Sequence, residues 1–215
     1  MKESGVNTVS PKRAQTRDRL LDAAVALFAE KGVLGASVEE ICERAGFTRG
    51  AFYSNFDSKD ELVLAAVERK GTEIHRSATE AANSVPETPI EPGSAEPVIR
   101  QAMLVFQASQ ALDPTWLLAR SEVRLYSLRN PEVRAPLQAV EQRIDDLLIA
   151  AIEAVIARQG ATLAVPAREL VRVLEGYYEA LATEALISGR GLEGPEWAER
   201  LADLVRALVR FGTDR

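Results

Sequence analysis

Residues 37–62 read SVEEICERAGFTRGAFYSNFDSKDEL, and this stretch decides the fold. It opens with Ser37 and, three residues later, Glu40, a capping box in which each side chain satisfies a free amide at the start of a helix. Gly46 makes a tight turn, after which Thr48 can cap a second short helix. Two short helices joined by a glycine turn are typical of a helix-turn-helix, whose second helix enters the major groove of DNA.

Outward from this stretch, almost every segment has the apolar spacing of a helix, and we find no convincing run of alternating β-branched residues. Glycines and prolines mark the breaks, beginning with Gly32 after the first helix. The chain is therefore predicted to be all-α, with about nine helices. Their expected ranges are 11–31, 38–45, 49–55, 59–83, 98–112, 114–129, 132–158, 167–189 and 196–211.

The breaks also divide the chain into domains. Residues 85–97 (VPETPIEPGSAEP) hold four prolines and a Gly-Ser pair, which indicates a loop between two helical parts. We expect an N-terminal three-helix DNA-binding domain followed by a larger helical domain. The predicted boundaries are a flexible N-terminal arm at 1–10, the helix-turn-helix domain at 11–57, a connecting helix at 58–83, a Pro-rich loop at 84–97 and the helical domain at 98–215.

Helical spacing divides the second short helix into two faces. Phe52 and Phe56 can point to the core, which leaves polar residues to face DNA. Arg49 can donate a fork to guanine, Gly50 allows close approach, and Tyr53 suits a phosphate. The whole predicted DNA-binding set is Arg17, Ser37, Thr48, Arg49, Gly50, Tyr53, Ser54, Asn55 and Lys59.

The stretch resembles the TetR family of transcriptional regulators. The likeness runs from about Thr16 to Leu62, through LFAEKG at 27–32, SVEEI at 37–41, TRG at 48–50, FYSNF at 52–56 and SKDEL at 58–62. Asn55 is a departure, because many family members carry His there. The resemblance implies a homodimer on a palindromic operator, with two recognition helices about 34–36 Å apart. It further implies that the larger helical domain, 98–215 together with 58–83, binds a ligand and dimerises, and that a small-molecule ligand relieves repression.

Charge by itself does not predict DNA binding. The formal net charge is −6, with nine basic against ten acidic residues up to Leu62 and 17 against 22 beyond it. The position of individual cations in the first 62 residues therefore matters more than the total.

The last two predicted helices are apolar enough to need a partner. In the TetR family such helices form a four-helix bundle between subunits; the alternative is that their apolar faces are buried only within the monomer. The predicted dimer contacts are Leu174, Tyr178, Leu181, Ala185, Trp197, Leu201, Leu204 and Leu208.

Aromatic and methionine side chains on the middle helices suggest either core packing or the lining of a pocket for a small apolar or aromatic ligand. The candidate lining residues are Met103, Phe106, Trp116, Arg120, Glu122, Tyr126 and Tyr177. Arg120 and Glu122 would orient a ligand or, alternatively, form an ion pair that contributes little.

Several classes of function find no support in the residues. One His (His75) and one Cys (Cys42) cannot build an ordinary zinc site, and the usual catalytic motifs are missing. We expect Cys42 to pack in the core rather than sense redox, and His75 to be structural rather than a ligand contact.

No run of about 18 apolar residues predicts a membrane span. This lack of a span leads us to expect a cytoplasmic protein. The missing zinc ligands and catalytic motifs lead us to expect no enzyme, no metal and no cofactor beyond an inducer. The alternatives are a C-terminal half that binds a protein partner instead of a small molecule, or an enzyme or plain helical scaffold.

Overall fold

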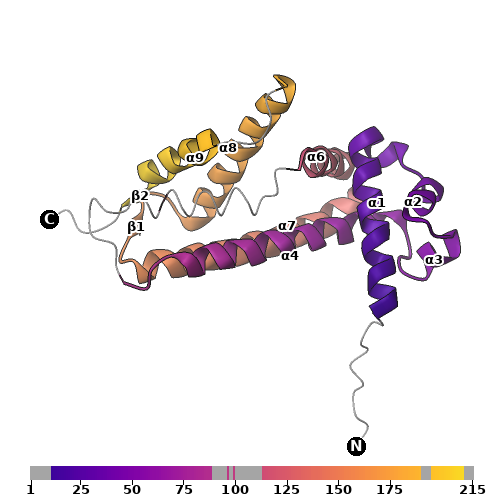
Figure 1. The fold of residues 1–215 in the computed structure, drawn as a ribbon, viewed down its shortest axis with the longest axis horizontal. Coiled ribbons are helices and arrows are strands. Elements are labelled where there is room, and N and C mark those ends of the chain that lie inside the picture. Colours follow the sequence, from indigo (N-terminus) through magenta and orange to yellow (C-terminus); the bar gives the residue numbers. More distant parts are fainter. Residues whose placement is uncertain (1–10, 89–95, 97–98, 100–112, 190–194, 211–215) are drawn as a thin grey trace, which may run out of the picture. The chain divides into compact units, whose positions relative to one another are not determined.

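The computed structural model describes residues 11–88, 96, 99, 113–189 and 195–210, with only the backbone for 195–198. Within these residues the chain forms eight helices and one small two-stranded ladder (Figure 1). The helices are α1 Pro11–Gly35, α2 Val38–Ala45, α3 Arg49–Tyr53, α4 Lys59–Ser84, α6 Pro114–Arg129, α7 Pro131–Arg158, α8 Ala167–Ile187 and α9 Pro195–Leu208.

The all-helical prediction is confirmed, and most helix ends fall within a few residues of their predicted positions. The predicted arm at 1–10, most of the predicted loop at 84–97 and nearly all of the predicted helix at 98–112 lie outside the described residues. No described helix has both the length and the apolar character needed to cross a membrane.

Two compact units divide the chain. The N-terminal unit contains residues 11–67 together with residues 115–137, and the second unit contains the rest of the described chain. This division differs from the predicted domain boundaries, because α6 and the start of α7 pack with the predicted helix-turn-helix domain. We call the whole N-terminal unit the DNA-binding head. The reason is a set of contacts far apart in sequence: Tyr126 Oη donates to Asp60 Oδ1 at 2.8 Å, and the Asn130 side chain donates to Tyr126 Oη at 3.0 Å.

Local chemistry sets the ends of the helices in the N-terminal unit. Ser37 Oγ accepts from the Glu40 amide at 3.2 Å, and the Glu40 carboxylate accepts from the Ser37 amide at 2.9 Å, so the capping box is confirmed. Gly46 takes a left-handed conformation (φ 72°, ψ 35°) at the end of α2. Gly32, the predicted end of the first helix, is a kink with φ 76° and ψ 165°, after which helical backbone resumes to Gly35.

A close-packed core supports this unit. Three phenylalanines contributed by α1, by α3 and by the turn after α3 are completely shielded from solvent, together with aliphatic side chains from the other helices. The largest fully buried side chains are Phe28, Phe52, Phe56, Leu20, Ile41, Leu62, Val33, Val63, Val123 and Val133.

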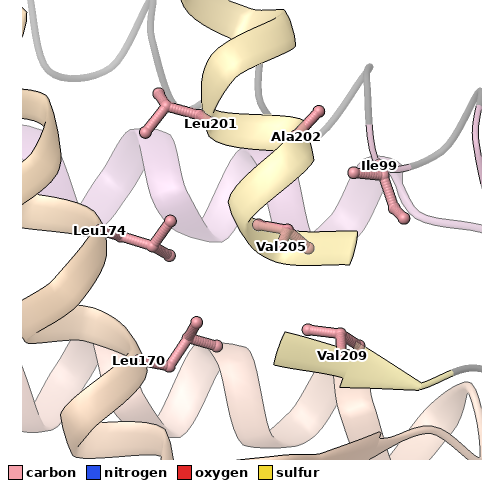
Figure 2. Close-up of a cluster of buried hydrophobic side chains, with 7 residues drawn as sticks. All are labelled: Ile99, Leu170, Leu174, Leu201, Ala202, Val205 and Val209. Atoms are coloured by element: carbon pink, nitrogen blue, oxygen red, sulfur yellow. The ribbon is translucent and has the colours of Figure 1, made fainter. Parts of the chain in front are cut away.

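The second unit has two hydrophobic clusters. In the first, α4 and α7 lie side by side, so close that a Cβ on Gly71 would collide with Ile144, and Ile74 and Leu148 are buried with Val171 of α8. In the second, α8 and α9 face each other (Figure 2), and the cluster consists of Ile99, Leu170, Leu174, Leu201, Ala202, Val205 and Val209.

The two-stranded ladder was not predicted. Strand β1 (Thr162–Leu163) pairs antiparallel with β2 (Val209–Arg210), with Thr162 opposite Arg210. The predicted last helix at 196–211 therefore ends at Leu208. Two residues are too few to show the alternation that identifies a strand in sequence.

The capping box makes the stability of the N-terminal unit depend on pH. The Lys31 ammonium, followed by the amide and hydroxyl of Ser37, lowers the pKa of Glu40 from 4.5 to about 2. A depressed carboxylate pKa stabilises the fold above the unfolded value and ceases to do so as pH falls through the folded one. We expect the difference in Tm between wild type and Glu40→Gln to be largest near neutral pH and to shrink between pH 4.5 and 2.

Glu43→Gln is the control, because it removes the same charge from the other end of α2. If its Tm difference followed the same pH course, net charge rather than the capping box would be the cause.

Candidate nucleic-acid interface

The helix-turn-helix consists of α2, the turn at Gly46 and α3. Phe47 N donates to Cys42 O at 2.9 Å and closes the turn, and Thr48 Oγ1 accepts from the Ala51 amide at 3.3 Å to cap α3. The side chain of Phe52, 0% exposed, attaches α3 to the core. The opposite face of this five-residue helix is consequently left for solvent.

The exposed face of α3 carries five of the predicted DNA-binding residues. Thr48, Arg49, Gly50, Tyr53 and Ser54 are all exposed, as the helical spacing required. Arginine and tyrosine supply donors for base edges and phosphates, while the glycine leaves the backbone open. This arrangement can present a short, protruding helix to a major groove.

Arg49 is the only cation of α3, and two neighbours hold it. Its Nη1 lies 2.7 Å from Glu39 Oε1 of α2, and its guanidinium carbon lies 5.9 Å from the centre of the Tyr53 ring. The contact with the Tyr53 side chain and then the charge of Glu39 raise the pKa of Arg49 further above its ordinary value. The guanidinium is therefore charged at every physiological pH.

Gly50 is exposed, and no described residue lies so close that it requires a glycine at this position. A Cβ there would meet only Thr48 Oγ1, at 3.7 Å, which is an ordinary contact. The lack of a side chain instead leaves free surface above the backbone of α3.

Asn55 does not face DNA as the sequence analysis predicted. It is 8% exposed, and its Nδ2 donates to Ala51 O at 2.8 Å and to Ser54 Oγ at 3.2 Å. The helix ends at Tyr53, so the backbone turns before position 55 and brings this side chain inward. The polar character of asparagine gave no sign of that burial.

Lys59 was predicted to suit a phosphate, but its amine is largely engaged inside the domain. Nζ donates to Val33 O at 2.9 Å and to Ala36 O at 3.0 Å, and it thereby fastens the segment that joins α1 to α2. Desolvation by burial lowers the pKa of Lys59. Since an ammonium has three N–H groups, at most one is left for DNA.

Ser37 and Arg17 also have structural partners. Ser37 is half-buried, and its hydroxyl donates to Glu40 Oε2 at 2.8 Å within the capping box. Arg17 Nη1 donates to Asn55 O at 2.8 Å, and its guanidinium carbon lies 4.2 Å from the centre of the Phe56 ring. Both side chains position the helix-turn-helix, and DNA contacts by them stay predictions.

Two residues near α3 were not assigned to the site from sequence. Arg13 Nη2 donates to Ser54 O at 2.9 Å, one helical turn before Arg17, so two cations of α1 bind carbonyls at the C-terminal end of α3. Glu39 is the partner of Arg49. The i, i+4 spacing of Arg13 and Arg17 is a signal that could have found the first; nothing local indicates the second.

The predicted ligand-pocket residues fall in different parts of the chain, and their role stays a prediction. Met103 and Phe106 lie outside the described residues. Trp116 (8% exposed), Arg120, Glu122 and Tyr126 are on α6 in the N-terminal unit, whereas Tyr177 is on α8 in the second unit. Glu122 packs closely against Gly32, because a Cβ added to that glycine would lie only 2.6 Å from Glu122 Oε2. Burial and then the Asp60 contact raise the pKa of Tyr126, in keeping with a packed polar network in the head.

Most of the side chains that were predicted to contact a second subunit are buried within one chain. Leu174, Tyr178, Leu181, Ala185 and Leu201 are each at most 7% exposed, and Leu204 and Leu208 are partly buried against the cluster of Figure 2. The side chain of Trp197 lies outside the described residues. For these residues the structure shows the alternative, burial inside the monomer.

A different stripe of α8 is open to solvent. Val173 is 42% exposed, Tyr177 37% and Ile187 83%, and the exposed Gly176 and Ala180 lie between them at helical spacing.

Cys42 is 3% exposed, and burial raises the pKa of its thiol, which suits packing and disfavours the reactive thiolate. Among the described residues, no cluster of His, Cys, Asp or Glu is arranged to hold a metal.

Comparison with known proteins gives a family match for the DNA-binding head. Residues 20–66 match the family model described as bacterial regulatory proteins, tetR family. The chain is 28% identical over 166 residues to the nicotine-responsive transcriptional repressor HdnoR of Paenarthrobacter nicotinovorans, covering 74% of this chain and 80% of that one. It is also 28% identical over 202 residues to the transcriptional repressor AcnR of Corynebacterium efficiens, covering 93% and 95%.

The fold agrees over nearly the whole length. The structure of the fatty acid degradation regulator FadR of Bacillus halodurans superposes with a TM-score of 0.69 over 95% of this chain and 96% of that chain, at 18% identity. The family match coincides with the helix-turn-helix and its supporting core. The helix-turn-helix part of this chain, residues 20–66, is therefore that of the tetR family of bacterial regulatory proteins.

Proposed function

We propose that this regulator represses transcription by binding a palindromic operator as a homodimer, and that a small apolar or aromatic molecule releases it. The observation that carries the proposal is the exposed face of α3, where Arg49, Gly50 and Tyr53 project from a helix held by the buried Phe52. Two such helices, about one turn of DNA apart (34–36 Å), would read the two halves of a palindrome. The site of action is the cytoplasm, where a bacterial chromosome lies.

The dimer would use the exposed stripe of α8. Val173, Tyr177 and Ile187 are apolar or aromatic, and the small residues Gly176 and Ala180 between them allow two helices to approach closely. Nothing in the described chain lies within 4 Å of a Cβ on Gly176. A two-fold axis beside this stripe would place the same residues on both sides of the contact.

A route for release runs through the N-terminal unit. Tyr126 of α6 holds Asp60 at the start of α4, and the neighbouring Lys59 holds the segment between α1 and α2. A ligand that displaced α6 or tilted α4 would disturb both contacts and so the setting of α3. To change operator occupancy from 99:1 to 1:99, the ligand must prefer the released state by about 10⁴-fold.

The ligand class is proposed from a relative and from this chain's composition. HdnoR is described as responsive to nicotine, a small aromatic base. The second unit of the present chain has two clusters of buried, mostly aliphatic side chains and an excess of acidic residues. An uncharged or cationic aromatic molecule fits that chemistry better than an anion.

The first test is selection of bound genomic fragments against excess non-specific competitor. Wild type should enrich a palindromic site, and Arg49→Ala/Tyr53→Ala should lose it, because each bidentate arginine–guanine contact is worth about 1–3 kcal/mol. Both proteins should show the same Tm and the same oligomeric state. A folded, dimeric wild type that enriched no site would contradict the proposal.

Gly50→Ala separates DNA contact from stability. The new methyl group has room in the free protein, and alanine favours a helix over glycine by about 0.5–1 kcal/mol, so Tm should stay equal or rise. Operator affinity should fall by at least about tenfold if the backbone of α3 approaches the bases. Unchanged affinity would mean that DNA does not come close to this position.

Tyr177→Glu/Ile187→Glu tests the dimer. A pair of like charges in an apolar two-fold contact should raise the dimer dissociation constant by at least about 100-fold, as measured by sedimentation equilibrium. Leu128→Glu is the matched control, because Leu128 is an exposed apolar residue (65%) on α6, outside the proposed contact, and this variant should leave the dimer intact. A dimer equally stable in the double variant would place the interface elsewhere.

A further inference from the structure

The cation of the recognition helix is opposed by a carboxylate on the same exposed surface. Arg49 Nη1 lies 2.7 Å from Glu39 Oε1, and the two side chains are 59% and 56% exposed. Glu39 is in the first turn of α2, where the free amides of a helix start favour a negative charge. The carboxylate is therefore held on the side from which α3 projects.

Stability does not account for this pair. Exposed arginine–carboxylate pairs contribute little to folding, because water and salt screen them and both side chains lose freedom. On a surface that binds a polyanion, an exposed glutamate also has a cost of its own, since each nearby negative charge repels phosphates. A role for Glu39 must therefore lie in what it does to Arg49.

The contact leaves Arg49 able to read a base. A guanidinium has five N–H donors, and Glu39 engages one nitrogen, so a parallel pair of donors remains for the O6 and N7 atoms of guanine. The Tyr53 ring, whose centre lies 5.9 Å from the guanidinium carbon, also restrains the side chain. The side chain is thus oriented before DNA arrives, and its charge is largely compensated.

We propose that Glu39 is a specificity-determining positioning residue, which acts through Arg49 and rests on the operator binding proposed above. By pairing with Arg49, it weakens the attraction of the guanidinium to phosphates of any sequence. It also orients the remaining donors toward base edges. Non-specific binding is therefore penalised more than binding to the correct base pair, which offers two acceptors in the right place.

The chain provides a matched control. Arg44 and Glu30 form a second exposed pair, with Nη1–Oε1 and Nη2–Oε2 distances of 2.6 and 2.8 Å. The exposed fraction of the Glu30 side chain, 54%, is almost that of Glu39. Glu30→Gln therefore removes the same charge from a similar pair in the same unit, but its arginine is not on α3.

The experiment measures dissociation constants for the selected operator and for a scrambled duplex across a salt series. Relative to wild type, Glu39→Gln should bind the scrambled duplex about 3- to 10-fold more tightly. Its plot of log K against log salt should steepen by about 0.9, the slope of one more phosphate contact. The ratio of specific to non-specific affinity should fall by about 3- to 10-fold, and Glu30→Gln should keep the wild-type ratio.

A double-variant cycle shows whether Glu39 acts through Arg49. In an Arg49→Ala background, Glu39→Gln should no longer change the ratio, because the group it positions is gone. Tm values of all variants verify that each is folded.

The outcomes separate this inference from the proposed function. If wild type selects a site and Glu39→Gln keeps the wild-type ratio, or if Glu30→Gln or the Arg49→Ala background shows the same loss, the role of Glu39 is overturned while operator binding stands. If wild type prefers no sequence, the proposed function fails, and the role of Glu39 fails with it.

Discussion

The burial of Phe52 and Phe56 is the interaction on which the rest of the DNA-binding head depends. An isolated helix shorter than about 12–15 residues is marginal in water, and α3 has five. Full burial of a phenylalanine contributes about 1.5–3 kcal/mol, and both rings are at most 1% exposed. The reading face of α3 is therefore a consequence of the opposite face being anchored in the core.

Polar contacts complete what the aromatic rings begin. Thr48 caps the start of α3, and Arg13 and Arg17 donate to carbonyls at its end. Lys59 does the same for the segment between α1 and α2. Three cations around the helix-turn-helix thus bind backbone carbonyls of the protein itself, in a stretch up to Leu62 that has no basic excess.

The position of α6 makes the head more than a helix-turn-helix. Tyr126 and Asp60 are 66 residues apart in the chain, yet their hydrogen bond places α6 in the same compact unit as α1 to α3. A movement of α6 would therefore act within the same compact unit that contains α3.

What the sequence by itself determined was the local part of the structure. The Ser37–Glu40 box, the turn at Gly46 and the exposed and buried faces of α3 follow from contacts within about four residues, which neighbouring letters encode. The same stretch carries the family likeness and predicts a DNA-binding regulator.

Only the tertiary structure decided the contacts between distant residues. The inward turn of Asn55, the pairing of Arg49 with Glu39 and the two-residue strands depend on where other helices lie, which no local pattern records. The same holds for α8, whose apolar residues surround much of the helix. Packing against α9 and α7 buried Leu174 and Val171 and left Val173 and Ile187 outside, because a helix with apolar residues on several faces is oriented by its neighbours.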